Sequence, residues 1–152
     1  IWQQTAATAT PHQGVHSTNN FASASPCTDG QHVYAFFGSR GLYCYAMDGQ
    51  LVWKRDDFGK MQTRNAFGEG SSPTISGSKI IVPWDHDGPS ALYALDKLTG
   101  KTLWKTNRDE PTNWSTPLIV ENDGQFVLHN SHIALPNDSL FVVCACRNMC
   151  EV

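Results

Sequence analysis

The chain has 152 residues, of which 40% are hydrophobic and 16% charged, a composition typical of a folded globular protein rather than of a disordered segment. Its formal net charge of -3 provides no basic field, which disfavours binding to nucleic acid or to an anionic membrane surface by electrostatics. No apolar run approaches the roughly 20 residues that a membrane-spanning helix needs.

The first 21 residues show no apolar periodicity. They are rich in Thr, Ala, Gln and His, so neither a strand nor a helix is predicted for them. We interpret 1–21 as a loop or as the remnant of a preceding structural unit.

Residues 22–56 contain short apolar runs that alternate with turn residues. The runs cover 25–28, 32–38, 42–47 and 50–55, and Asp-Gly pairs occupy two of the three breaks. Runs rich in Val, Tyr and Phe between such breaks predict four antiparallel strands joined by tight turns. A longer polar segment, 57–70, follows this unit.

The same order of elements returns in residues 71–108. Ser72-Pro73 repeats Ser25-Pro26, and strands are predicted at 72–75, 79–84, 91–96 and 102–105. Residues 109–125 then contain a polar loop and, from Ser115, the first strand of a third copy.

The repeat length predicts the architecture. The marker prolines Pro26, Pro73 and Pro117 are about 45 residues apart, and four strands in a period of roughly 40 to 50 residues are typical of a β-propeller blade. We therefore predict an all-β fold of antiparallel four-stranded blades, about two full blades plus the start of a third. Because a propeller needs about four or more blades to close, we expect the chain to be part of a longer protein.

The tail, 126–152, departs from this pattern. We expect neither a second strand nor another copy of the turn hairpin in it, and it ends in a run of cysteines at Cys144, Cys146 and Cys150. Their spacing matches no common zinc pattern, so no metal site is predicted there.

Strand alternation places the long loops together. In an antiparallel four-stranded unit, the loops after the second and fourth strands leave at one end, and the short turns leave at the other. The long loops carry many polar and aromatic groups that short structural turns do not require. The candidate ligand face consists of Arg40, Arg64, Asn65, Glu69, Asp85, His86, Asp87, Arg108, Asp109, Glu110 and Trp114.

Two clusters on this face contain side chains that could bind a ligand or take part in catalysis. His86 between Asp85 and Asp87 could bind a divalent metal or act as a base, although a polar loop turning at these aspartates is the interpretation we favour. The run 108–110 could clamp a carboxylate or a sugar, but adjacent opposite charges usually solvate one another. Trp114 could stack on a ligand or pack against a neighbouring blade. No catalytic and no metal-binding residue is predicted.

A hairpin motif identifies the repeat. Residues 94–104 read Ala-Leu-Asp-Lys-Leu-Thr-Gly-Lys-Thr-Leu-Trp, and 44–53 contain a shortened copy. Allowing a three-residue deletion in the turn, we align Tyr45, Ala46, Asp48, Gly49 and Trp53 with Tyr93, Ala94, Asp96, Gly100 and Trp104. The motif resembles the repeat of pyrroloquinoline-quinone (PQQ)-like β-propellers.

The resemblance implies a docking hairpin in which a tryptophan packs against the next blade. The residues that match it are Ala46, Asp48, Gly49, Trp53, Ala94, Asp96, Thr99, Gly100 and Trp104. It also implies a propeller of seven or eight blades, usually exported or periplasmic, and related to the outer-membrane protein assembly lipoprotein and to quinoprotein alcohol dehydrogenases.

Function is less closely implied than fold. We interpret the protein as a non-catalytic scaffold that binds a protein or small-molecule partner on the long-loop face and adjoins further blades of the same protein. There are two alternatives. The chain could be part of a PQQ-dependent quinoprotein dehydrogenase, or it could be a docking module in outer-membrane protein assembly. The dehydrogenase would be expected to have adjacent cysteines, a calcium site and an aspartate base, and no position matches them. No cofactor is therefore expected, with PQQ and calcium possible only under that alternative.

Overall fold

The computed structural model describes residues 1–122 and 125–129. The regular structure of these residues is β-strand apart from two short 3-10 helices, η1 (Gly38–Arg40) and η2 (Arg64–Ala66). No helix in the described part of the chain is long and apolar enough to cross a bilayer. The all-β prediction is therefore confirmed.

Two four-stranded sheets follow one another along the chain. The first contains β1 (Cys27–Thr28), β2 (His32–Phe36), β3 (Leu42–Ala46) and β4 (Leu51–Arg55). The second contains β5 (Thr74–Ser76), β6 (Lys79–Trp84), β7 (Ser90–Asp96) and β8 (Thr102–Arg108). In both, neighbouring strands are antiparallel and lie in chain order, as in a propeller blade. We name these sheets blade 1 and blade 2.

A third sheet corrects one prediction about the tail. β9 (Leu118–Asn122) pairs antiparallel with β10 (Gln125–His129), with Phe126 opposite Glu121 and Leu128 opposite Ile119. The expectation that no second strand follows residue 125 is wrong, because Phe126, Val127 and Leu128 form a short apolar run of good strand formers directly after a turn sequence. The predicted absence of a third hairpin and the run Cys144, Cys146 and Cys150 lie outside the described residues.

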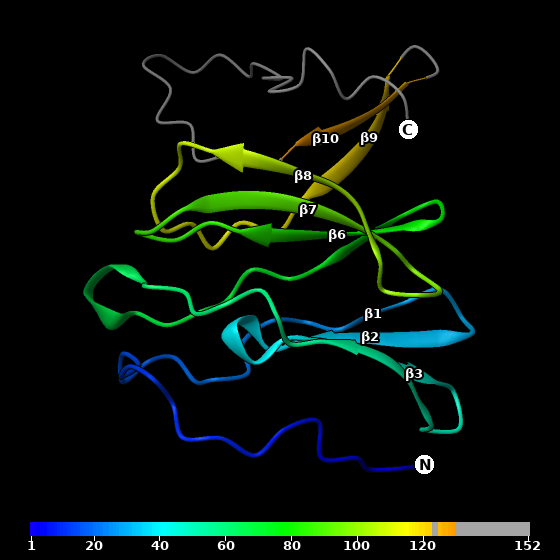
Figure 1. Ribbon diagram of the computed structural model, residues 1–152, viewed down its shortest axis with the longest axis horizontal. Coiled ribbons are helices and arrows are strands. Elements are labelled where there is room, and N and C mark those ends of the chain that lie inside the picture. Colours follow the sequence, from blue (N-terminus) through cyan, green and yellow to red (C-terminus); the bar gives the residue numbers. More distant parts are fainter. Residues whose placement is uncertain (123–124, 130–152) are drawn as a thin grey trace.

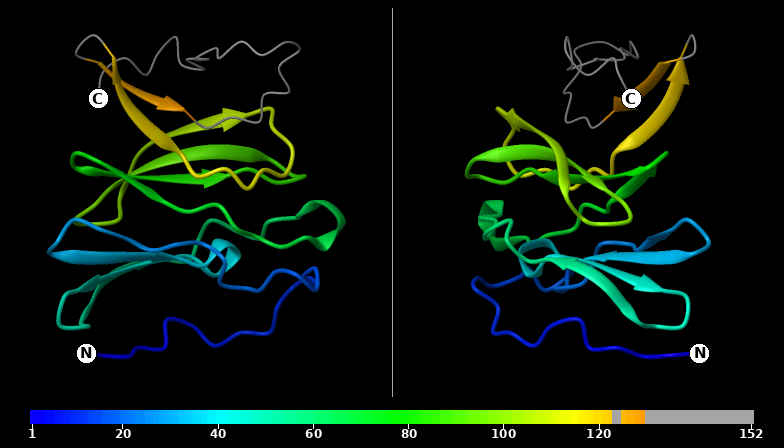
Figure 2. Two further views of the ribbon diagram at one scale, coloured as in Figure 1. Left: turned by 180° about the vertical axis from the view of Figure 1, so that it is seen from behind. Right: turned by 45° about the vertical axis from the view of Figure 1, so that its right-hand side comes forward.

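The blades are stacked face to face (Figures 1 and 2), and the core lies between them. Buried side chains of blade 1, such as Tyr34 and Phe36, belong to the same cluster as Ile80, Val82 and Trp84 of blade 2. Full burial of one large apolar side chain stabilises a fold by about 1.5–3 kcal/mol. Since each sheet supplies only one half of this core, the blades depend on each other for stability.

An indole fastens blade 1 to blade 2. Trp53 of β4 donates a hydrogen bond from Nε1 to the carbonyl oxygen of Lys97, 3.0 Å away, in the β7–β8 turn. In the same turn, a Cβ added at Gly100 would lie 2.7 Å from the Trp53 ring. Only glycine admits the indole this closely, and its φ of +70° is one that other residues adopt at a cost.

The same indole contact with a turn recurs at the start of the chain. Trp2 donates from Nε1 to the carbonyl oxygen of Met47 at 2.9 Å, and a Cβ added at Gly49 would lie 2.7 Å from its ring. Trp2, Trp53 and Trp104 are separated by 51 residues in each case. Trp2 therefore has the contacts that a fourth-strand tryptophan of a preceding blade would make, and sequence reasoning missed it.

Strand pairing corrects the hairpin alignment. Trp53 lies opposite Cys44 in blade 1, whereas Trp104 lies opposite Ala94 in blade 2. Cys44, not Ala46, is thus equivalent to Ala94. The backbone N–H of Ala46 closes its turn as that of Asp96 does. The shift is two residues, so side chains stay on the same face of the sheet and the hydrophobic pattern could not reveal it.

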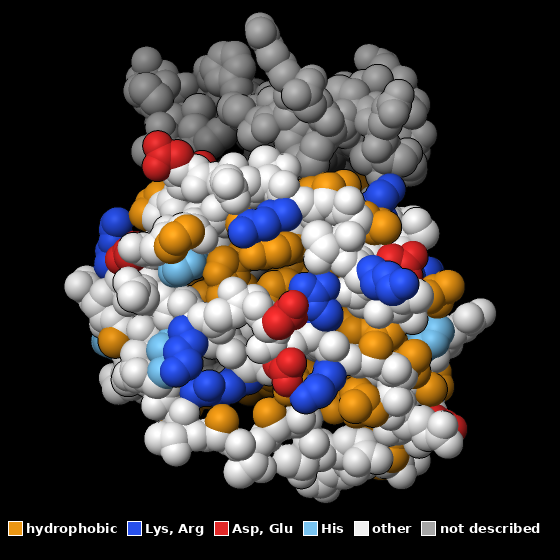
Figure 3. Space-filling model, in the orientation of Figure 1, with side chains coloured by type: hydrophobic (Ala, Val, Ile, Leu, Met, Phe, Trp, Pro, Cys, Tyr) orange, Lys and Arg blue, Asp and Glu red, His pale blue; other side chains and the backbone are white. Residues whose placement is uncertain are grey.

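Charged side chains are scattered over the face drawn in Figure 3, where basic and acidic groups lie among apolar ones. This distribution agrees with the small net charge of the chain.

Candidate functional site

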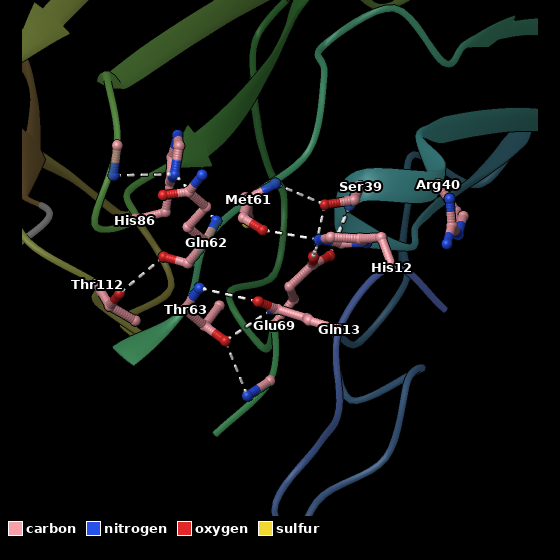
Figure 4. A network of polar contacts seen from close by, with 12 residues as sticks. His12, Gln13, Ser39, Arg40, Met61, Gln62, Thr63, Glu69, His86 and Thr112 are labelled. Atoms are coloured by element: carbon pink, nitrogen blue, oxygen red, sulfur yellow. Dashed lines mark hydrogen bonds and ion pairs between the residues drawn. The ribbon is translucent and has the colours of Figure 1, made fainter. Parts of the chain in front are cut away.

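The long loops gather at one end of the blades, the left end in Figure 1, and the short turns lie at the other. On this side, hydrogen bonds join the N-terminal segment, the loop before β5, the loop after β6 and the loop after β8, as Figure 4 shows in part. Gln13 of the N-terminal segment donates to Thr63 Oγ1 at 2.8 Å, and Thr112 Oγ1 of the loop after β8 donates to Asp87 Oδ1 at 2.8 Å. We call this side the long-loop face.

His86 holds two loops together. Its Nδ1 accepts the backbone N–H groups of Gln62 and Gly88, each at 3.1 Å. A nitrogen that accepts cannot carry a proton, so the ring is the neutral tautomer protonated on Nε2. Burial lowers the pKa of His86 from its ordinary value, which also favours the neutral form. The imidazole thus acts as a fixed acceptor for the loop backbone.

The buried carboxylate of Asp85 forms an ion pair with Arg108. Its side chain is only 1% exposed and accepts from Arg108 Nε at 2.9 Å. Arg108 also lies 3.8 Å from Glu110 through Nη2. Removing one partner of a buried pair leaves an uncompensated charge, so this arrangement is suited to holding the loop after β8.

Glu69 joins the loop before β5 to the loop after β2. Its Oε2 accepts the backbone N–H of Ser39 at 2.6 Å, and its Oε1 accepts the Ser39 hydroxyl. Met61 in turn donates its N–H to the same hydroxyl at 2.8 Å. Both carboxylate oxygens therefore accept hydrogen bonds from this loop.

Asp87 accepts both the N–H and the hydroxyl of Thr112. These bonds, together with nearby Arg64, hold the pKa of Asp87 below its ordinary value. Arg64 lies 3.9 Å from Asp87, but its own side chain is 59% exposed. The three residues Asp85, His86 and Asp87 are thus brought together by sequence but face different partners.

The segment around η2 is unusual in backbone conformation. Asn65 and Ala66 have φ values of +51° and +54°, and alanine in this region is disfavoured by roughly 1–2 kcal/mol. Such outliers occur often at functional sites. The segment presents Phe67, which is 38% exposed.

Phe67 is part of an aromatic patch that sequence reasoning missed. Its ring lies 6.1 Å from Trp114 in an edge contact and 5.0 Å from His16. Trp114 remains 41% exposed although its Nε1 donates to Gly68 O at 2.8 Å. We define the aromatic patch as Phe67, Trp114 and His16. Phe67, in the mostly polar stretch 62–70, was the signal in the sequence, but its contact with Trp114 requires the fold.

The remaining candidates lie apart from this patch. Arg40 lies at the C-terminal end of η1 and donates from Nη2 to Thr10 O at 2.5 Å. Asp109 is exposed. The long-loop face therefore combines a hydrogen-bonded interior with an exposed rim.

The described residues can be compared with the calcium site and the adjacent cysteines expected of a quinoprotein dehydrogenase. No three His, Cys, Asp or Glu side chains within 1–122 and 125–129 are grouped to hold a metal ion. Cys27 and Cys44 lie on strands either side of β2, both opposite Tyr34, so they are not adjacent in sequence or in the sheet. Burial raises the pKa of each thiol to about 11, which disfavours thiolate chemistry.

Comparison with known proteins identifies the family. The profile of a PQQ-type family described as outer membrane protein assembly factor BamB matches residues 1–142. No curated protein matches the chain. Among solved structures, a europium-containing methanol dehydrogenase is 12% identical over 57% of this chain, with a TM-score of 0.46. BamB from Moraxella catarrhalis is 16% identical over 69% of this chain, also with a TM-score of 0.46.

The chain corresponds to 15% and 33% of those two structures. The family assignment therefore depends on the profile match, which covers most of the chain, together with the four-stranded blades described above. On this basis the chain belongs to the PQQ-like β-propeller family described as outer membrane protein assembly factor BamB.

Proposed function

We propose that the chain is part of a non-catalytic, exported scaffold whose long-loop face binds a protein partner. The observation that carries the proposal is the division of this face into two classes of side chain. Groups able to do acid, base or metal chemistry are engaged inside the protein, and aromatic groups are presented outside it.

The engaged groups are those expected of an active site. His86 uses Nδ1 to accept two backbone N–H groups, Asp85 is paired with Arg108, and Glu69 accepts from Ser39. A general base must lie within hydrogen-bond reach of the proton that it abstracts. These three residues serve the loop structure instead.

The exposed groups are those typical of protein recognition. Phe67 and Trp114 contribute partly exposed rings, and Arg64 has an exposed side chain on the same loop as Phe67. Tryptophan, tyrosine and arginine are enriched among residues that dominate binding energy, and aromatic side chains are enriched at interfaces. Because the loops beneath are joined by hydrogen bonds, the patch is held ready for binding with little loss of conformational entropy.

The family description suggests the kind of partner. Its printed name is that of an outer membrane protein assembly factor, so we propose a component of outer membrane protein assembly as the partner and an exported location for the chain. No observation favours the quinone-dependent dehydrogenase. Adding PQQ and calcium to the full-length protein is expected to give no dye reduction with alcohols, and turnover would contradict the scaffold role.

The experiment that tests the proposal is photo-crosslinking in the bacterial envelope. A photoreactive amino acid replaces Phe67 in the full-length protein, and Leu98 provides the matched control, because it is also exposed but lies in the β7–β8 turn at the opposite end. We expect crosslinks from position 67 to an outer membrane assembly protein and none from position 98. Equal crosslinking from both positions, or none from position 67, would overturn the proposal.

A further inference from the structure

A cleft separates the N-terminal segment from blade 1. It has a volume of about 410 Å³ and lies between residues 4–14 on one side and the segments 37–40 and 68–69 on the other. Clefts of roughly 300–1,000 Å³ with mainly apolar walls and a few polar groups are typical of small-molecule sites. Nothing in the proposed scaffold role uses this cleft.

We call the boundary between the N-terminal segment and blade 1 the first junction, and the boundary between blade 1 and blade 2 the second junction. The second junction is closed at the place that corresponds to this cleft. There, the loop before β5 contacts the loop after β6 directly, with Asp87 N donating to Gln62 O at 2.8 Å. At the first junction, the loop after β2 reaches the N-terminal segment through the long side chain of Arg40, which donates to Thr10 O. The two backbones are therefore held apart, and the cleft occupies the space between them.

Arg40 is the cationic side chain of the cleft with donors to spare. A guanidinium carries five N–H groups, and Arg40 forms one hydrogen bond and no ion pair within the described residues. The other ionisable groups of the cleft, Glu69 and His12, lie 3.9 Å apart, and both are engaged, since Glu69 accepts from Ser39 and His12 Nε2 lies 2.8 Å from Met61 O. An added anion would find Arg40 available.

The rest of the lining is largely apolar. Phe21 and Phe37 contribute rings, and Ala6, Ala7 and Ala9 contribute small side chains. Phe21 is 55% exposed, so a ligand would cover apolar surface that otherwise contacts water. The cleft thus offers one positive anchor beside an apolar wall.

We propose that this cleft binds a small organic anion, a carboxylate on a short aliphatic body. The carboxylate accepts N–H groups of Arg40, as arginine forks commonly bind carboxylates through two parallel hydrogen bonds. The aliphatic body lies against Phe21 and Phe37.

The test measures binding of hexanoate to the full-length protein by calorimetry or by ligand-observed NMR, with neutral hexanamide as the matched probe. We expect hexanoate to bind at least about tenfold more tightly than hexanamide, the effect of a charge-assisted hydrogen bond. Arg40→Gln is expected to abolish this preference and Arg40→Lys to reduce it. Lys101→Gln, at an exposed cationic side chain in the β7–β8 turn at the opposite end, is expected to leave it unchanged.

Several results would overturn the proposal. Equal binding of the two probes, loss of the preference in Lys101→Gln, or a crystal structure of the full-length protein in which other residues fill the cleft would each do so. Unfolding curves of the Arg40 variants check that they are folded. Partner crosslinking from position 67 is independent of this cleft, so the two proposals fail separately.

Discussion

Two junctions of this protein use the same indole contact and differ in everything around it. Trp2 bonds to Met47 O and covers Gly49, as Trp53 bonds to Lys97 O and covers Gly100. The second junction adds a buried core between the sheets, whereas at the first Trp2 remains 38% exposed. The repeated hairpin thus provides the docking geometry, and the surrounding side chains decide how firmly each junction is held.

Polar contacts widen the difference. At the second junction, Arg55 donates to Gly100 O at 2.7 Å and Lys97 Nζ lies 3.0 Å from Asp29. At the first, apart from the Trp2 hydrogen bond to Met47 O, polar contacts such as the Gln13–Thr63 pair lie at the long-loop end. Substitutions at contacts of the second junction, and at the equivalent contacts of the first where the chain has them, should therefore differ in their effect on stability.

The largest effect is expected from removing the indoles. Trp53→Ala should lower the free energy of unfolding by about 3 kcal/mol, because it leaves a cavity beside the core and an unpaired carbonyl. Trp2→Ala should cost about 1 kcal/mol, since its ring is more exposed. Chemical denaturation of the full-length protein measures both, and equal losses would contradict the contrast between junctions.

The glycines should respond next most strongly. Gly100→Ala introduces a Cβ against the Trp53 ring at positive φ, and we expect a loss of about 2–3 kcal/mol in unfolding free energy. Gly49→Ala should cost about 1–2 kcal/mol, because Trp2 can move away. Gly77→Ala is the control: it also has positive φ, with no atom within 4 Å of the added Cβ. A loss at Gly100 no larger than at Gly77 would refute the close packing.

Asp29 should give a smaller effect with a defined pH dependence. Burial opposes its ionisation, but hydrogen bonds from Lys97 and from the backbone N–H groups of His32 and Gln31 outweigh burial and hold the pKa of Asp29 well below its usual range. The stabilisation is therefore present above the unfolded pKa of about 4 and is lost as the pH falls further.

Asp29→Asn should thus cost about 1–2 kcal/mol at pH 7, with the difference from wild type shrinking below about pH 4. Unfolding curves at several pH values measure this. A difference that stays constant down to pH 2.5 would show that the ion pair with Lys97 does not contribute.

His86 should give the smallest effect. Because burial lowers its pKa, the unfolded state takes up a proton more readily, and stability falls as the pH drops below about 6.5. The loss between pH 7 and pH 6 should stay below about 0.7 kcal/mol. His86→Asn keeps an acceptor near Nδ1 and should remove this pH dependence, whereas His86→Ala should destabilise at every pH. An unchanged pH dependence in His86→Asn would contradict the assignment.

The repeating architecture can be predicted from local sequence patterns. The period of the prolines and the alternation of apolar runs with Asp-Gly and Thr-Gly turns predict four-stranded blades, because strand patterning and turn chemistry are local properties. The 51-residue spacing of Trp2, Trp53 and Trp104 was also present in the printed sequence. It was overlooked because the segment after Trp2 shows no strand pattern.

The partners of the polar residues, in contrast, depend on how the loops fold against one another. Asp85, His86 and Asp87 are neighbours in sequence, yet Asp85 pairs with Arg108, His86 accepts from Gln62 and Asp87 accepts from Thr112. Partners separated by 23–25 residues are chosen by loop conformation and burial, which no local pattern encodes. The contact of Phe67 with Trp114 and the cleft beside Arg40 have the same origin, because both form only where separate loops meet.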